Sequence, residues 1–132
     1  MQANEKTQTN ETADPFVLID PPLDNYVMIY IPNTYDIDKE LDQDLREEHI
    51  EIFQAFFSSA FGGYSMFSGR GGWYSSELQR HICEDILYIK AFCTSESLKK
   101  YKQELYNNIL HMKKELQQEA ISVEINNKLY FV

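Results

Sequence analysis

The sequence predicts an α+β domain, because two segments with helical periodicity alternate with segments of strand composition. The chain has 132 residues, of which 43% are hydrophobic and 14% aromatic, which is enough apolar material for one core. The polar residues 1–23 are expected to form a flexible N-terminal tail. Residues 24–132 are expected to form the single folded domain.

Five segments carry the strand prediction. Residues 26–31 are β-branched and aromatic, and Pro32 stops the run. Residues 84–92 have apolar side chains on both faces, which indicates a strand with neighbours on both sides. Residues 120–125 alternate in polarity, and a turn at 126–127 leads into a short C-terminal strand. The apolar residues 16–19 are expected to dock as an edge strand.

The first expected helix precedes the glycine-rich segment. Asp44 is the expected N-cap, and Glu47 three residues later completes a capping-box-like pair. Gly62 is well placed to end the helix in the left-handed conformation. The buried face is predicted from residues that recur at helical spacing: Leu45, His49, Ile52, Phe53, Phe56 and Ala60.

The second expected helix has the clearer pattern. Ser95 or Ser97 is its expected N-cap. Its apolar residues keep intervals of three and four, as on one face of a helix: Leu98, Tyr101, Leu105, Ile109, Met112 and Leu116.

The resulting order is β-α-β-β-α-β with a short strand added at the C-terminus. Two helices separated by strands that can pair antiparallel fit the ferredoxin-like split βαβ plan, with both helices on one face of the sheet. The other face would be open, and such a face in a small domain is often covered by a second copy. We therefore expect a homodimer.

The net charge of −9 is unevenly distributed, because residues 1–60 carry −10 and residues 61–132 carry +1. The simple interpretation is solubility, and the alternative is an acidic surface that binds a basic partner or mimics nucleic acid. Direct nucleic-acid binding is disfavoured, since phosphates are held by basic surfaces. The candidate partner-binding residues are the acidic ones before and at the start of the first helix: Asp36, Asp38, Glu40, Asp42 and Asp44.

No apolar run reaches the length of a membrane span, and the polar N-terminus lacks the features of a secretory signal. We expect a cytoplasmic protein that does not bind membranes. Cys83 and Cys93 are ten residues apart without a CxxC motif, so free thiols are expected.

All five glycines lie between residues 62 and 72, beside an arginine, a tryptophan and two tyrosines. We expect an irregular hairpin whose arms are residues 64–67 and 73–75. Its backbone N–H groups could hold an anion together with Arg70, while Trp73 stacks on a ring. The alternative is a twisted hairpin whose glycines permit bulges and whose aromatic residues fill the core. The candidate ligand-binding residues are Gly62, Gly63, Tyr64, Ser65, Gly69, Arg70, Gly71, Gly72, Trp73 and Glu84.

Glu84 opens a strand that leads away from this segment, so it can point back toward Arg70 or Trp73. Glu84 and His81 are weak candidates for an acid–base pair, and a salt bridge from Glu84 to an arginine is the favoured alternative. Gln118 precedes the last main strand and is a further candidate for the same site. No firm catalytic constellation emerges from the sequence.

No metal or cofactor is expected. The acidic residues 36–47 place oxygen ligands at the calcium-loop offsets of an EF-hand, but Leu41 stands where the loop needs glycine and no helix precedes it. His49, His81 and His111 show no zinc spacing with each other or with the cysteines.

From residue 26 onward the pattern resembles an uncharacterised family of small bacterial and mobile-element proteins. The resemblance rests on residues 30–34, the Phe-Gly-Gly at 61–63, the Gly-Arg-Gly-Gly-Trp at 69–73, Glu84, and the Gln-Glu-Ala at 118–120. It implies a ferredoxin-like fold and carries no activity with it. Two departures are Tyr64-Ser65, where a small residue and threonine are expected, and a hairpin turn at 75–80 without glycine.

These observations favour a small non-enzymatic binding protein that occupies a partner protein or sequesters a small anionic ligand. A phage or mobile-element inhibitor of a host system would suit this size and charge. Two alternatives stay open: an enzyme that uses Glu84 and His81, and an acidic scaffold or nucleic-acid-mimicking module.

Overall fold

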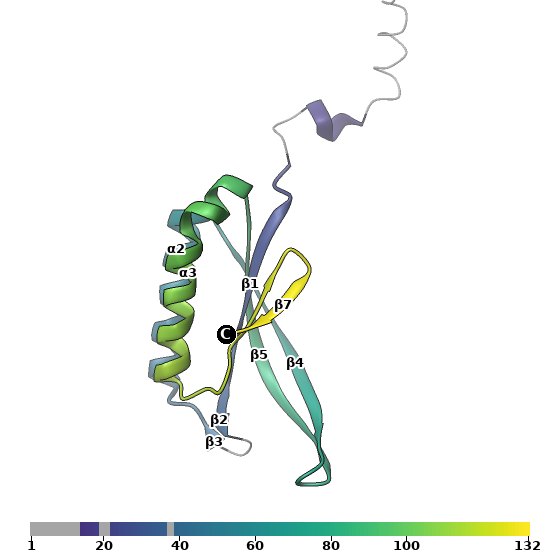
Figure 1. Cartoon of the computed structure of the whole chain (residues 1–132), viewed down its shortest axis with the longest axis vertical. Helices are drawn as coiled ribbons and strands as arrows, with labels where there is room; N and C mark the ends of the chain where they lie inside the picture. The colour runs from purple at the N-terminus through teal and green to yellow at the C-terminus, as the bar shows by residue number, and fades with distance from the viewer. Residues whose placement is uncertain (1–13, 19–21, 37–38) are drawn as a thin grey trace, which may run out of the picture.

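A computed structural model describes residues 14–18, 22–36 and 39–132. The domain has two layers, with two long helices side by side on one face of a twisted antiparallel sheet (Figure 1). The elements in chain order are η1 (Pro15–Leu18), β1 (Asn25–Ile31), β2 (Thr34–Asp36), β3 (Lys39–Glu40), α2 (Gln43–Phe61), β4 (Ser65–Ser75), β5 (Arg80–Cys93), α3 (Ser95–Glu115), β6 (Ser122–Ile125) and β7 (Lys128–Phe131).

The main sheet has five strands in the order β4-β5-β1-β6-β7, and every neighbouring pair is antiparallel. The predicted α+β class with two helices is confirmed. So is the interior position of the strand at residues 84–92, because β5 lies between β4 and β1. The register places Ile29 of β1 opposite Ile89 of β5 and Val123 of β6. The short strands β2 and β3 pair only with each other.

The core lies between the sheet and the helices. Alternate residues of β1 and β5 face the helices, and Val27, Ile29 and Ile89 among them are fully buried. The predicted face of the second helix is confirmed, with Tyr101 only partly buried but packed against the core. On α2 the buried set includes two residues that helical spacing did not select, Ile50 and Phe57, while Leu45 and Ile52 are only partly buried. The apolar stripe of α2 is therefore wider than predicted, since it contacts both α3 and the sheet.

Both predicted N-caps are displaced by a few residues. The carboxylate of Asp42, not Asp44, accepts hydrogen bonds from Asp44 N at 2.9 Å and Leu45 N at 3.2 Å. Thr94, not Ser95 or Ser97, caps α3 by accepting from Ser97 N. Each helix begins earlier than predicted because an equally suitable oxygen lies upstream. The C-terminal prediction is confirmed, since Gly62 ends α2 with φ of 90°.

The expected hairpin within the glycine segment is wrong. Residues 65–75 form one continuous strand, β4, whose partner is β5, and the turn lies at residues 76–79. Gln79 adopts a positive φ of 54° in that turn, where the sequence offers no glycine. Residues 80–86 of β5 pair with β4 alone, so the two strands project beyond the rest of the sheet as a ribbon (Figure 1).

The expected edge strand at residues 16–19 is also wrong. Residues Pro15–Leu18 form a 3-10 turn, and residue 19 lies outside the described part of the chain. The Asp14 carboxylate accepts a hydrogen bond from Phe16 N at 3.0 Å, and Pro15 fixes φ near the helical value. This local capping outweighs the weak strand preference of four apolar residues.

Candidate functional site

The structure does not bring Arg70 and Trp73 together. They are three residues apart on β4, and side chains alternate between the faces of a strand. Arg70 lies on the face that the helices occupy, where its Nε is 3.4 Å from Asp85 Oδ1 of β5. Both side chains are more than 70% exposed, so this ion pair contributes little to stability. Trp73 lies on the open face opposite Ile82 and is 48% exposed.

The glycines within β4 allow bulky side chains of β5 to lie across the strand. A Cβ on Gly69 would be 2.6 Å from Cε2 of Tyr88. The Tyr88 ring stacks on Phe67 with 5.2 Å between centroids and meets Tyr30 edge-on at 4.8 Å. At Gly69 the structure agrees with the packing interpretation of the glycines rather than with the ligand-binding one. The missing side chain makes room for a row of aromatic rings on the open face.

The remaining candidates from the start of the glycine segment lie at the opposite end of β4. Gly62, Gly63, Tyr64 and Ser65 line a shallow depression of about 220 Å³ beside the end of β5. Nine of the ten predicted ligand residues therefore occupy several places along an eleven-residue strand and the loop before it, and Glu84 lies on β5, so the ten do not form one pocket.

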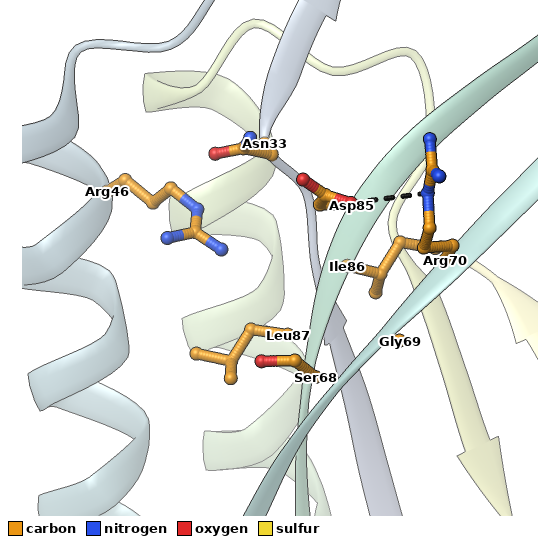
Figure 2. A pocket seen from close by; sticks show the side chains of 8 residues that line it. All are labelled: Asn33, Arg46, Ser68, Gly69, Arg70, Asp85, Ile86 and Leu87. Atoms are coloured by element: carbon orange, nitrogen blue, oxygen red, sulfur yellow. Dashed lines mark ion pairs between the residues drawn. The ribbon is translucent and has the colours of Figure 1, made fainter.

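A larger cleft lies between α2 and the ribbon, and we call it the Arg46 cleft (Figure 2). It has a volume of about 550 Å³ and is lined by Asn33, Arg46, Ser68, Gly69, Arg70, Asp85, Ile86 and Leu87. The guanidinium of Arg46 extends from α2 into the space opposite β4 and β5 (Figure 2). Arg46 Nε donates a hydrogen bond to Pro32 O at 2.8 Å, which fixes the direction of the side chain.

Burial lowers the pKa of the Arg46 guanidinium, and the nearby Glu47 carboxylate opposes this shift. Within the described residues Arg46 makes no ion pair, so a partly desolvated positive charge faces the cleft. Such a charge favours an anionic ligand, because a carboxylate or phosphate can bind a guanidinium with two parallel hydrogen bonds. Arg70, which sequence analysis selected as a ligand-binding residue, lines this cleft. Arg46 was not selected, because nothing in the sequence distinguishes it from other polar residues in the first turn of a helix.

Glu84 lies in a small adjoining depression of about 90 Å³, which we call the Glu84 notch. Glu84 Oε2 accepts a hydrogen bond from Thr34 Oγ1 at 2.7 Å, and Gln118 Nε2 donates to Thr34 O at 2.8 Å. Gln118 thus lines the same notch, as its position before the last main strand had indicated. Ile86 lines both the notch and the Arg46 cleft, but Glu84 and Asp85 are consecutive on β5, so the two carboxylates point to opposite faces of the ribbon.

His81 does not join Glu84. The two residues are three positions apart on β5 and so face opposite sides of the ribbon, and His81 is exposed near its tip. The hydrogen bond of Glu84 is with Thr34 rather than with an arginine. The acid–base pair considered for Glu84 and His81 is therefore not formed between these two described residues.

The acidic partner-binding candidates are only partly placed. Glu40 and Asp44 are exposed, while Asp42 has a structural role as the N-cap of α2. Asp36 ends β2, and Asp38 lies outside the described residues. A surface for a basic partner at this edge stays a prediction.

The open face of the sheet carries a polar cluster that sequence analysis missed. Glu124 of β6 accepts hydrogen bonds from the hydroxyls of Tyr26 and Tyr30 of β1. The hydrogen bond to Glu124 raises the pKa of Tyr26, and burial followed by the same carboxylate raises that of Tyr30. Alternation places both tyrosines on one face of β1, which is the signal that could have found them.

Both cysteines are free, as expected. Cys93 is buried, which raises the pKa of its thiol, and Cys83 is exposed on the ribbon. Within the described part of the chain, no helix is long and apolar enough to cross a membrane.

Comparisons with known proteins identify structural relatives but no sequence family. No family model and no curated protein matches the sequence. A phage SAM lyase solved in complex with S-methyl-5'-thioadenosine aligns with a TM-score of 0.58 and 13% identity, over 86% of this chain and 95% of that one. The apo phage SAM lyase aligns at 0.51 with 13% identity, over 82% and 87%.

A Bacillus cereus protein related to NIF3 aligns at a TM-score of 0.46 with 10% identity, over 82% of this chain and 25% of that one, too weakly for an argument. At these identities the comparisons establish that the chain shares its fold with the phage SAM lyase. They do not identify the bacterial and mobile-element family that the sequence resembles.

Proposed function

We propose that this protein binds S-adenosylmethionine (SAM) and cleaves it, as a small phage- or mobile-element-type inhibitor of a host system. The observation that carries the proposal is the partly buried guanidinium of Arg46, which faces a cleft of about 550 Å³ without an ion-pair partner among the described residues. The shared fold with a phage SAM lyase supports this choice of ligand.

The charges around the cleft suit the chemistry of SAM. Its carboxylate would bind Arg46, and its ammonium group would lie near Asp85, which lines the same cleft. The apolar side chain of Leu87, which lines the same cleft, offers a surface for the adenine ring.

We also infer that the fold is the ferredoxin-like split βαβ plan with β7 added at one edge. The order β4-β5-β1-β6 supports this, because β1 and β4 are then parallel to each other and separated by the antiparallel strand β5. Both connecting helices cover the same face of the sheet (Figure 1).

Calorimetric titration with three related ligands tests the binding proposal. S-adenosylhomocysteine keeps the amino-acid end but has a neutral sulfur, and S-methyl-5'-thioadenosine lacks the amino-acid end. We expect Arg46→Gln to weaken SAM binding roughly ten- to hundredfold and to leave the thioadenosine affinity unchanged, since only SAM offers a carboxylate. Lys99→Gln, an exposed substitution on α3, is the matched control. Equal SAM affinity in Arg46→Gln and the wild type would contradict the proposal.

The second candidate function is sequestration of SAM without cleavage. A turnover measurement distinguishes it from the proposed cleavage. Cleavage would break the bond between the sulfonium and Cγ of the amino-acid chain. The electron pair would stay on the sulfur, which leaves as S-methyl-5'-thioadenosine, and the substrate's own carboxylate oxygen would close onto Cγ to give a lactone. Chromatography of a SAM incubation should reveal both products accumulating beyond the amount of protein present. Asp85→Asn should raise the SAM concentration needed for half-maximal release, because it removes the negative charge near the ammonium group of SAM. Tight SAM binding without any product would instead support the non-enzymatic inhibitor.

We further propose that the protein is a homodimer through the open face. Support comes from the side chains of that face that stay at least partly exposed in one copy: Tyr26, Tyr30, Phe67, Trp73, Tyr88, Phe92, Leu129 and Phe131. Light scattering behind a sizing column gives the mass directly. Phe67→Glu on this face should produce monomer, and a wild type that elutes as monomer would contradict the interface.

A further inference from the structure

Three metal-ligating side chains converge where the start of α2 meets the end of α3. His49 Nε2 lies 2.6 Å from Glu115 Oε1, and His111 Nε2 lies 3.4 Å from the same oxygen. The imidazole rings of His49 and His111 have centroids 5.1 Å apart. One donor atom from each of the three residues lies within 4.8 Å of the others.

His49 is an unusual residue for the interior of this domain. It is the one buried polar or charged residue among those described, with no exposed surface. Its Nδ1 is buried without a hydrogen-bond partner. The one hydrogen bond of the His49 ring among the described residues is from Nε2 to Glu115, and an ionised carboxylate only accepts, so this contact keeps the ring proton on Nε2. A cation that binds Nε2 must displace this proton, and Nδ1, which has no other partner, is free to carry the ring proton instead.

The other two residues leave a path from solvent. His111 is 53% and Glu115 38% exposed, and they stand one turn apart on α3. Donors around a tetrahedral ion with bonds of ~2.0–2.1 Å lie roughly 3.3 Å apart. Two side-chain rotations give that spacing: the partly exposed Glu115 carboxylate moves away from His49, and the half-exposed His111 ring turns toward His49 from within 4.8 Å.

We propose that His49, His111 and Glu115 form a binding site for a divalent first-row transition metal, with Zn²⁺ the natural occupant. Two imidazole nitrogens and one carboxylate oxygen suit Zn²⁺ and leave a fourth position for water. The ion takes the place of the proton between His49 and Glu115 and joins α2 to α3. This site lies in the helix layer and does not depend on the proposed SAM activity.

Titration of the metal-free full chain with Zn²⁺ tests the site. We expect one ion per chain with a dissociation constant below about 100 µM and a higher melting temperature when the ion is bound. His111→Ala, at a half-exposed position that tolerates truncation, should weaken binding at least about tenfold. Glu115→Gln should weaken it as well, because the neutral amide keeps the hydrogen bond but loses the charge. Mg²⁺ should not compete, since it prefers oxygen ligands.

His81→Ala is the matched control, because His81 is an exposed histidine outside the cluster. Cys83→Ser controls for metal held by the exposed thiol. The proposal is overturned if wild-type protein shows no binding below about 100 µM, or if His111→Ala binds as tightly as the wild type. Loss of binding in His81→Ala or Cys83→Ser, with His111→Ala unaffected, would also overturn it by placing the ion on the ribbon.

Discussion

The outer part of the β4–β5 ribbon and the interface between α2 and α3 differ in how they hold their polar side chains. On the ribbon, Arg70 and Asp85 pair in water, and backbone pairing with one neighbour holds each strand. Between the helices, His49 is fully buried against a carboxylate and surrounded by packed apolar residues. Substituting a polar residue on the ribbon should therefore change the free energy of unfolding only slightly, whereas substituting the buried His49 should lower it substantially.

Truncating the core of the helix layer should have the largest effect. Phe53 is fully buried and its ring lies 6.1 Å from that of Phe57. We expect Phe53→Ala to lower the free energy of unfolding by about 3–5 kcal/mol, because it removes apolar contacts and leaves a cavity. Denaturant unfolding measures the change. Tyr74→Ala on the exposed ribbon should stay within about 0.5 kcal/mol, and a comparable loss there would erase the contrast between the regions.

A glycine within β4 tests whether the ribbon is merely a solvated hairpin. Gly69→Ala should destabilise the protein by about 1–3 kcal/mol, since the new Cβ would meet the Tyr88 ring at 2.6 Å. The same substitution in a Tyr88→Ala background should have almost no effect, and this double-mutant cycle isolates the contact. A penalty that persists without the Tyr88 ring would point to the strand backbone instead.

The start of α2 offers the smallest of these effects. Asp42→Ala should lower stability by about 1 kcal/mol, because it removes the oxygen that accepts from Asp44 N and Leu45 N. Asp44→Ala should lose only about 0.3 kcal/mol, from its favourable position near the positive end of the helix dipole. Comparing the melting temperatures of the two variants distinguishes Asp42, the observed N-cap, from Asp44, the predicted one. A larger loss for Asp44→Ala would reverse the assignment.

The elements of the domain could be read from local patterns. Residues 98–116 keep one apolar face over five turns, and residues 26–31 are stopped by Pro32, so neither prediction needed distant contacts. The C-terminal turn at Asn126 and Asn127 was equally local, since asparagine tolerates the positive φ values of 50° and 69° found there. The caps moved by one or two residues because several oxygens compete for the same N–H groups.

The site was harder to predict, because it depends on which residues from distant segments share a face. The glycine segment was taken for a hairpin with one pocket, yet pairing with β5 makes it a straight strand that sends Arg70 and Trp73 to opposite sides. Arg46 joins Arg70 only because α2 packs beside the ribbon.

The chain's composition and periodicity are enough to specify an α+β domain, its two helices, its central strands and its acidic N-terminal half. The meeting of His49 with His111 and Glu115, like that of Thr34 with Glu84, follows from packing instead. Periodicity describes neighbours within about one helical turn or two strand positions. Contacts between segments far apart along the chain arise only when the sheet and helices close on their shared core.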